Sequence, residues 1–235
     1  MFLSVVLPCL NEEGTLPRFE SELKPVLDGL GKSYEAIAVD DGSTDGTLDA
    51  LRALSRRWTN LVVLAHDENR GLGRALRTGF AAAGGEFVAT LDSDLTFSPA
   101  LLPEMIKKQE ETSADLVGGN PFMGREAAPA VPWSRRLPSI CINAFYRGLF
   151  SLSFGAYTPI CRLYRREALK TLALTAEGFE INAEIAARFI QKKFRLIEIP
   201  APLTVRQAGA SKLRPWKELK AHAALILHLT LGAGG

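Results

Sequence analysis

Two aspartates one residue apart, Asp92 and Asp94, end a short hydrophobic stretch in EFVATLDSDLTF, residues 86–97. The apolar run 87–91 has β-branched members, which predicts a buried strand. Two adjacent carboxylates at its end would repel each other, and burying them unpaired is costly. A divalent cation removes both penalties, because Mg²⁺ or Mn²⁺ binds through one or two carboxylates together with substrate phosphates. The pair therefore predicts a metal site; the alternative is a solvated turn or a cap on the helix that follows.

The chain around this pair alternates between strands and helices. Apolar runs and amphipathic periodicity predict strands at 2–8, 35–39, 61–65, 87–91 and 115–117, and helices at 15–30, 45–56, 74–83 and 101–110. Such alternation implies an α/β fold, a mostly parallel Rossmann-like sheet flanked by helices with right-handed crossovers.

Polar clusters follow three of these strands. They are Asn11-Glu12, Asp40-Asp41 and Asp92-Asp94. Ligands bind beyond the carboxyl ends of the strands in such sheets, so the three clusters are expected to meet in one cleft. The glycines of 71–76 lack the third glycine of the dinucleotide fingerprint, and no lysine-bearing phosphate loop is present. A nucleotide bound here would therefore be held by carboxylates and a metal.

Composition sets wider limits. The chain has 235 residues, 47% hydrophobic and 23% charged, which suits one large domain or one domain with an appendage. Its three cysteines have no C-x-x-C spacing, which fits a reducing compartment. The start of the chain is interpreted as a strand and not as a signal peptide, and no run approaches the ~20 apolar residues of a membrane span.

Charge is spread unevenly although its net value is only +2. Residues 1–50 hold ten acids and three bases, whereas residues 188–220 hold nine bases and two acids. The basic segment is either a solvated face or a surface that meets phosphates or anionic lipid. No nucleic-acid partner is expected, and the oligomeric state is left open.

Four segments in order carry a resemblance: VVLPCLNEEGTL, VDDGSTDGT, NRGLGRALRTGF and ATLDSDLTFSP. Together they resemble family 2 glycosyltransferases of the GT-A fold, and the later WSRR, GFEINAE and VRQAGASK are similar to dolichol-phosphate mannose synthases and related polyprenyl-phosphate glycosyltransferases. The resemblance covers roughly residues 2–215. It implies a hexosyltransferase that uses a nucleotide-sugar donor and a Mg²⁺ or Mn²⁺ cofactor.

The resemblance also assigns residues. Pro8, Asn11, Glu12, Gly71 and Ser93 would line the nucleotide-sugar pocket, with Asp41 at the base or ribose and Asp92 and Asp94 on the metal. Arg135 and Ser139 match positions that hold the lipid phosphate, and Arg206 and Lys212 match an element that closes over the diphosphate. The chain departs from the pattern at Leu10, Thr96 and Asn120, which leaves the sugar and the acceptor open.

The acceptor decides whether a base is needed. A lipid phosphate is already largely anionic at neutral pH, because a phosphate monoester has its second pKa near ~6. A hydroxyl acceptor would need a general base, for which Glu184 or Glu180 is the candidate. The alternative for Glu184 is a surface ion pair with Arg188, one helical turn away.

Two segments suit a membrane surface. Polar residues recur every four positions from Arg135 to Ser151 within an otherwise apolar helix at 135–154, which would turn a polar stripe toward the cleft or simply pack in the core. The apolar residues of 216–231 lie among lysines and arginines, which is typical of an interfacial helix. We therefore expect a glycosyltransferase domain at 1–212 and an amphipathic, interfacial tail at 213–235.

The sequence thus favours a metal-dependent, inverting glycosyltransferase that moves a sugar to a polyprenyl phosphate, peripheral at the cytoplasmic face of a membrane. A family member with a hydroxyl acceptor is the near alternative. A non-catalytic protein that binds nucleotide sugar or lipid is another, and a nucleotidyltransferase is a third.

Overall fold

A computed structural model describes residues 1–123, 133–204 and 215–231, with only the backbone described at 133–139 and 215–217. Its centre is a seven-stranded sheet in the order β3-β2-β1-β4-β6-β5-β7. The strands are β1 (Leu3–Cys9), β2 (Tyr34–Asp40), β3 (Leu61–Ala65), β4 (Phe87–Thr90), β5 (Leu116–Asn120), β6 (Arg162–Arg165) and β7 (Leu196–Pro200). All neighbours pair in parallel except β6, which runs antiparallel to β4 and β5.

One face of the sheet is covered by helices from the first half of the chain. They are η1 (Phe19–Leu23), a π-helical turn that continues into α1 (Lys24–Gly29), together with α2 (Thr47–Ser55) and α4 (Leu101–Thr112). Alternate residues of β1, such as Leu3, Val5 and Leu7, pack in the same buried cluster as apolar residues of these helices. Val6, between them, packs in the cluster on the other face, so β1 is buried on both sides, as expected of a sheet covered by helices on both faces.

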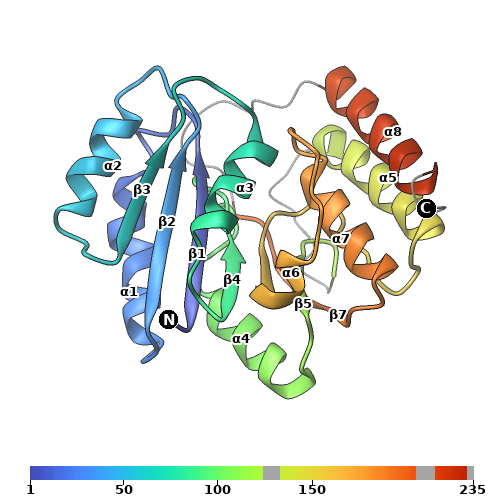
Figure 1. Cartoon of the computed structure of the whole chain (residues 1–235), viewed down its shortest axis with the longest axis horizontal. Coiled ribbons are helices and arrows are strands. Elements are labelled where there is room, and N and C mark those ends of the chain that lie inside the picture. Colours follow the sequence, from blue (N-terminus) through green and yellow to red (C-terminus); the bar gives the residue numbers. More distant parts are fainter. Residues whose placement is uncertain (124–132, 205–214, 232–235) are drawn as a thin grey trace.

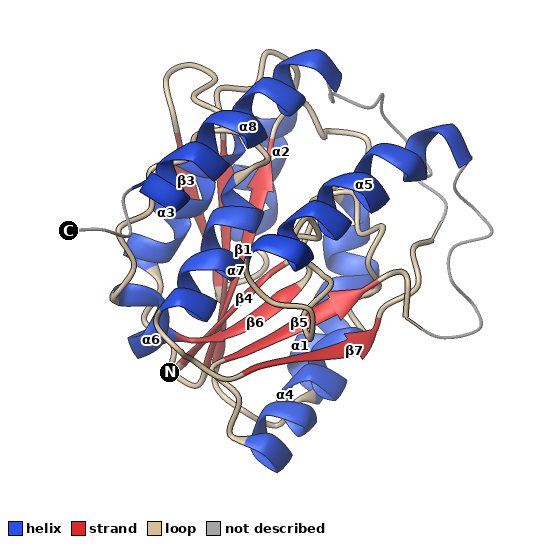
Figure 2. Cartoon of the chain, turned by 90° about the vertical axis from the view of Figure 1, so that its right-hand side faces the viewer, coloured by secondary structure: helices blue, strands red, loops and turns tan. Residues whose placement is uncertain are grey.

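The opposite face is covered by α3 (Leu72–Ala82) and α7 (Ile181–Gln191), as Figure 1 shows. Two longer helices, α5 (Trp133–Leu149) and α8 (Pro215–Leu231), lie side by side outside α7 (Figure 2). Short α6 (Arg166–Lys170) follows β6. The buried His222, Leu225 and Leu229 tie α8 to this second cluster, and the Tyr146 hydroxyl of α5 lies 3.0 Å from Nδ1 of His222.

The predicted α/β class and the predicted parallel strands are confirmed, with two corrections. The helix expected from residue 15 is preceded by turns at 13–16; its helical residues begin at Pro17 and pass into the π-turn at Phe19. The helix expected over 135–154 ends at Leu149, which places Ser151 in the loop that follows.

Candidate active site

The three predicted polar clusters lie on neighbouring strands. The strands β2, β1 and β4 are adjacent and parallel, so their carboxyl ends meet at one edge of the sheet (Figure 1). β1 pairs with β4 only as far as Val6, whereas its pairing with β2 continues to Cys9. Pro8, which has no amide hydrogen to donate, therefore lies beyond the end of the β4 ladder.

Asn11 and Glu12 join the loop after β1 to the loop after β2. The amide of Asn11 donates to Ser43 Oγ at 2.8 Å, and Asn11 Oδ1 accepts from the amide of Thr44 at 2.7 Å. The amide of Glu12 donates to Thr47 Oγ1 at 2.8 Å. The motif after β1 thus fixes the loop after β2, and both predicted pocket residues lie where the two loops meet.

Asp41 binds the loop that follows β3. Its Oδ1 accepts from the amide of Arg70 at 3.0 Å and lies 2.7 Å from Nδ1 of His66, while its Oδ2 accepts from the amide of Gly71 at 2.8 Å. Gly71 has φ of +89°, and a Cβ there would overlap the carbonyl oxygen of Glu177. Only glycine tolerates this conformation and this close approach, which together keep the amide of residue 71 beside Asp41.

Asp40, its neighbour, has an unused acceptor. Its Oδ2 accepts weakly from the amide of Ser43 at 3.2 Å, but its buried Oδ1 has no hydrogen-bond partner within the described part of the chain. A buried carboxylate oxygen without a partner is costly, and a ligand donor would relieve that cost. The sequence predicted Asp40 only as a member of its cluster. Two neighbouring aspartates look alike in a sequence, so it does not indicate which carboxylate is already hydrogen-bonded within the protein.

Thr96 brings the two metal candidates together. Its hydroxyl contacts Asp92 Oδ2 and lies 2.9 Å from Asp94 Oδ1, and its amide donates to the same two oxygens at 2.8 and 3.1 Å. Ser93 and Asp94 are buried, and Asp92 is partly buried. Burial, together with the neighbouring Asp94, raises the pKa of Asp92 to about 8. The pair is thus an electrostatically expensive arrangement that a cation would stabilise.

The alternative interpretation of this motif, a cap on the next helix, is not what the contacts show. The N-cap of α4 is Ala100, without a side-chain cap, and the carboxylates of Asp92 and Asp94 instead accept from Thr96 and Phe97. Among the described residues, no group of three or more His, Cys, Asp or Glu side chains could hold a metal ion. A cation at Asp92 and Asp94 would therefore complete its ligands with substrate oxygens, as Mg²⁺ commonly does.

Glu184 is a structural anchor in this arrangement. It is fully buried on α7, accepts from the amides of Thr175 and Ala176 at 3.0 and 2.8 Å, and pairs with Arg188 at 2.8 Å. The ion pair suggested by the sequence forms, but its acidic partner is buried and not at the surface. The loop that Glu184 holds also contacts the start of α3, where the carbonyl of Glu177 accepts from the amide of Gly73 at 2.7 Å.

The predicted phosphate-binding residues are not all described. Arg206 and Lys212 lie outside the described residues. Arg135 and Ser139 lie one turn apart in α5, but their side chains are also outside the described part. The next member of the predicted polar stripe of α5, Asn143, binds the protein's own backbone: its Oδ1 accepts from the amides of Tyr157 and Thr158 at 2.9 and 3.1 Å.

Comparison with solved structures supports this fold. Glucosyl-3-phosphoglycerate synthase from Mycobacterium tuberculosis, in complex with UDP, matches with a TM-score of 0.72 at 24% identity, covering 99% of this chain and 80% of that one. The same synthase in complex with Mn²⁺, UDP and phosphoglyceric acid matches with a TM-score of 0.67 at 26% identity, covering 100% and 78%.

Two curated relatives are similar over most of this chain. An undecaprenyl-phosphate 4-deoxy-4-formamido-L-arabinose transferase from Edwardsiella ictaluri (strain 93-146) is 30% identical over 230 residues, which cover 97% of this chain and 68% of that protein. A transferase of the same name from Shewanella sediminis (strain HAW-EB3) is 32% identical over 212 residues, covering 90% and 61%. The chain thus spans about two thirds of the length of these relatives.

A family model settles the assignment. The model described as glycosyl transferase family 2 matches residues 4–173, which include all three polar clusters, most of β1 and the whole of β2 to β6. The GT-A-like sheet and the sequence relatives agree with this match. The chain belongs to glycosyl transferase family 2 and is a glycosyltransferase.

Proposed function

We propose that this enzyme transfers a sugar from a nucleotide-sugar donor to a polyprenyl phosphate, with a divalent cation bound by Asp92 and Asp94. The observation that carries the proposal is the shared contact of both carboxylates with Thr96, at the edge of the sheet where the adjacent strands β2, β1 and β4 end. Two hard oxygen ligands in a buried position suit Mg²⁺ or Mn²⁺.

The donor side follows from the leaving group. A nucleotide sugar releases a nucleoside diphosphate, and a cation bound there supplies Lewis-acid stabilisation of the charge on that product. Asp40 offers an unpaired buried oxygen to a donor group of the base or ribose, and Asp41 holds the 70–71 backbone beside it. The M. tuberculosis synthase, 26% identical, was solved with Mn²⁺ and UDP, which supports a divalent cation and a nucleoside diphosphate as the bound groups here.

A phosphate acceptor fits this site because it can react without a general base. A phosphate oxygen that is already ionised can attack the anomeric carbon directly, and attack opposite the departing diphosphate inverts that centre. The hydrogen bonds and ion pair of Glu184 weigh against its use as a base for a hydroxyl acceptor. Both curated relatives carry undecaprenyl phosphate in their names, which supports a polyprenyl phosphate here.

For four residues we propose the roles that the resemblance implies: Arg135, Ser139, Arg206 and Lys212. The first two would hold the acceptor phosphate, because a guanidinium can bind phosphate oxygens through two hydrogen bonds. The last two would add positive charge at the diphosphate. The described chain reaches Thr204, two residues before Arg206, and Thr204 is bound directly to the carbonyl of Thr96.

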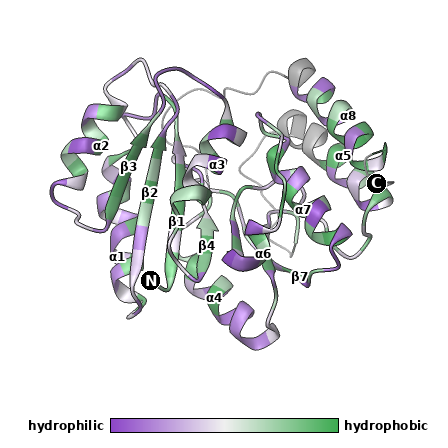
Figure 3. Cartoon of the chain, in the orientation of Figure 1, coloured by the Kyte–Doolittle hydropathy of each residue, from purple (hydrophilic) through white to green (hydrophobic). Residues whose placement is uncertain are grey.

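Access to a lipid would come through α5 and α8. Six of the exposed large apolar side chains lie on these helices or just after α5, namely Phe145, Leu149, Leu152, Leu219, Leu227 and Leu231. Figure 3 shows apolar residues along both helices, which lie side by side in Figure 2. In the described part of the chain no helix is long and apolar enough to cross a bilayer. We propose that this α5–α8 face rests on the membrane surface that holds the acceptor.

A donor screen tests the reaction. The purified protein is incubated with Mn²⁺ or Mg²⁺ and a panel of nucleotide sugars, with a polyprenyl phosphate or hydroxyl compounds as acceptors, and separately with nucleoside triphosphates. The products are identified by mass spectrometry. The proposal expects a lipid monophosphate sugar and a free nucleoside diphosphate. A sugar attached to a hydroxyl compound would favour the alternative acceptor. Pyrophosphate released from a nucleoside triphosphate would indicate a nucleotidyltransferase, and no turnover with tight donor binding would indicate a non-catalytic protein.

A further inference from the structure

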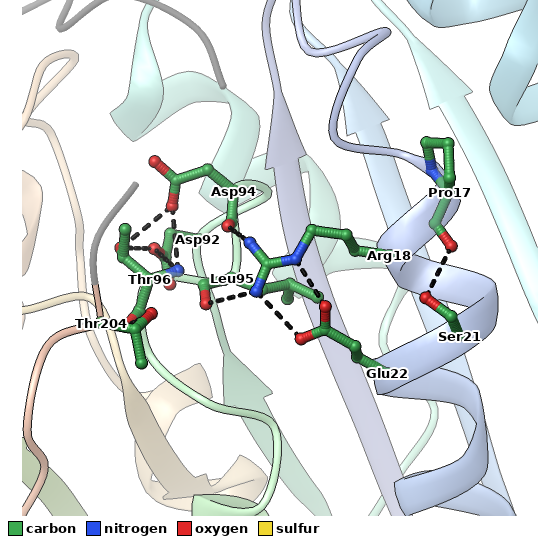
Figure 4. A network of polar contacts seen from close by, with 9 residues as sticks. All are labelled: Pro17, Arg18, Ser21, Glu22, Asp92, Asp94, Leu95, Thr96 and Thr204. Carbon is green, nitrogen blue, oxygen red and sulfur yellow. Dashed lines mark hydrogen bonds and ion pairs between the residues drawn. The ribbon is translucent and has the colours of Figure 1, made fainter. Parts of the chain in front are cut away.

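Arg18 reaches the Asp92–Asp94 loop from a distant part of the chain. Its Nη1 donates to the carbonyl oxygen of Asp94, and its Nη2 donates to the carbonyl oxygen of Leu95 at 3.4 Å (Figure 4). The side chain is only 16% exposed. These contacts join residues 76 and 77 positions apart, so they connect the segment after β1 to the loop after β4.

Glu22 holds the guanidinium in place. Its two carboxylate oxygens accept from Nε and Nη2 of Arg18 at 2.7 and 2.9 Å, so the pair is bidentate. Such a pair fixes the plane and direction of the guanidinium as well as adding energy. The remaining nitrogen, Nη1, is thereby aimed at the loop, as Figure 4 shows.

The local fold explains why Arg18 is available. It immediately precedes the π-turn η1, whose Phe19 and Leu23 are fully buried in the core. Those two anchors fix the turn against the sheet, and Arg18 and Glu22, each one residue earlier, share the adjacent face. π-Turns are rare and occur frequently at functional sites, which agrees with a special requirement at this position.

The loop that Arg18 contacts needs such support. Leu95 has φ of +48°, an uncommon value for a residue with a side chain. Backbone held in a sparsely populated conformation persists only where its surroundings stabilise it. Two carbonyls of this turn are bound by Arg18, and the next one, that of Thr96, is bound by Thr204. The loop is therefore held through its main chain from two sides, and its carboxylates remain directed toward Thr96.

From these contacts we infer that Arg18, buttressed by Glu22, is a positioning residue that sets the separation and direction of the Asp92 and Asp94 carboxylates for the cation. The inference rests on the proposed metal site. Within the described part of the chain, the hydrogen bonds from Arg18 to the loop go to carbonyl oxygens, so it acts through the main chain and is not itself a ligand. Its charge also interacts favourably with both aspartates, which leaves two explanations of its effect, geometry and charge, for experiment to separate.

The test measures Mn²⁺ binding without turnover. Free Mn²⁺ is followed by its electron paramagnetic resonance signal as the ion is titrated into wild type, Arg18→Met, Arg18→Lys, Glu22→Gln and Asp94→Asn. Loss of an outer-shell partner typically weakens metal affinity ~10–100-fold, and we expect this range for Arg18→Met. Arg18→Lys keeps the charge but not the fork, so it should remain within about threefold of Arg18→Met. Glu22→Gln should weaken binding by a smaller factor.

Arg57→Met is the matched control. Arg57 makes a comparable pair with Glu20, at 2.9 Å, but that pair is exposed and none of its hydrogen bonds reaches the Asp92–Asp94 loop. This variant should bind Mn²⁺ as wild type does, and thermal unfolding of each variant establishes that it is folded. Wild-type affinity in a folded Arg18→Met, or full recovery by lysine, would overturn the positioning role. Failure of wild type to bind Mn²⁺ more tightly than Asp94→Asn would instead overturn the proposed metal site, and the inference with it.

Discussion

Thr204 binds the carbonyl oxygen of Thr96 twice, through its amide at 2.9 Å and its hydroxyl at 3.0 Å. An isolated antiparallel bridge between Phe97 and Leu203 accompanies these bonds. Two sequence-distant segments are therefore fixed to each other next to the proposed metal ligands. The segment that continues from Thr204 carries Arg206 and Lys212, so this junction links the two charged parts of the proposed site along the chain.

Removing the Thr204 hydroxyl tests this junction. Thr204→Val keeps the β-branched shape and the amide hydrogen bond but loses the second donor. A neutral hydrogen bond contributes ~0.5–1.5 kcal/mol, which corresponds to a decrease in kcat/KM of about 2–10-fold if the bond orders the site. Steady-state kinetics measure it, and Thr230→Val is the control, because the Thr230 hydroxyl donates to carbonyls within α8. An unchanged kcat/KM for Thr204→Val would mean that the hydroxyl does not order the site.

Glu184→Gln separates an anchor from a base. Glutamine offers one acceptor oxygen where Glu184 uses two, and its amide would face the backbone donors of Thr175 and Ala176. Leaving buried donors unpaired costs ~1–3 kcal/mol, so the free energy of unfolding should fall by about that amount in urea titrations. The pH–rate profile of the folded variant should keep its shape. A loss of turnover by about 1,000-fold or more, with unchanged stability, would make Glu184 a general base.

How far the sequence predicted this structure depends on the element. The first four strands were predictable because each is an apolar run between turn signals, and parallel pairing then placed the polar clusters at one edge. Only the start of β5 was predicted, because its sequence LVGGN soon gives way to two glycines and an asparagine. β6 was not predicted, since it is a four-residue RLYR strand whose buried Arg162 donates from its two Nη atoms to carbonyls of Asn182, Ala156 and Tyr157. A charged residue in so short a run does not indicate a central strand.

The site was predictable in its carboxylates and not in their supports. Asp92 and Asp94 stand out because paired charges after an apolar strand need an explanation. Arg18 gives no such signal, because a side chain that binds main-chain carbonyls places no requirement on residue types 76 positions away. The interpretation of Glu184 stayed open for a related reason: an i,i+4 pair with Arg188 fits a surface as well as a buried anchor, and only its backbone partners distinguish them.

Acid should loosen α8. Burial lowers the pKa of His222 from 6.5, although the Glu180 carboxylate opposes this, so the folded state resists the proton that the unfolded chain accepts. Stability is then fully present above about pH 6.5 and falls as the pH drops through that value toward the lowered pKa. Thermal unfolding at pH 7.5 and 5.5 should show a larger loss for wild type than for His222→Gln. The exposed His228→Gln should behave as wild type, and equal losses in all three proteins would contradict this prediction.

The α5–α8 face should bind anionic vesicles. Each basic residue near such a surface contributes ~1 kcal/mol, and salt screens this part but not the insertion of apolar side chains. Co-sedimentation should therefore weaken in high salt without vanishing, and Leu227→Ser with Leu231→Ser should reduce it further. Val62→Ser, at an exposed position on β3, is the matched control. If the intact protein stays in the supernatant at low salt, the face does not bind membrane and the hydroxyl-acceptor alternative gains.

The central claim is that Asp92 and Asp94 bind a cation on which sugar transfer depends. The most direct measurement is the rate of nucleoside diphosphate release, with polyprenyl phosphate present, as Mn²⁺ is titrated into protein freed of metal by chelation. Wild type should be inactive without the ion and saturate as it is added, while folded Asp94→Asn should stay at least about 100-fold slower at every concentration. Full wild-type turnover in the presence of the chelator, or normal turnover by Asp94→Asn, would contradict the claim.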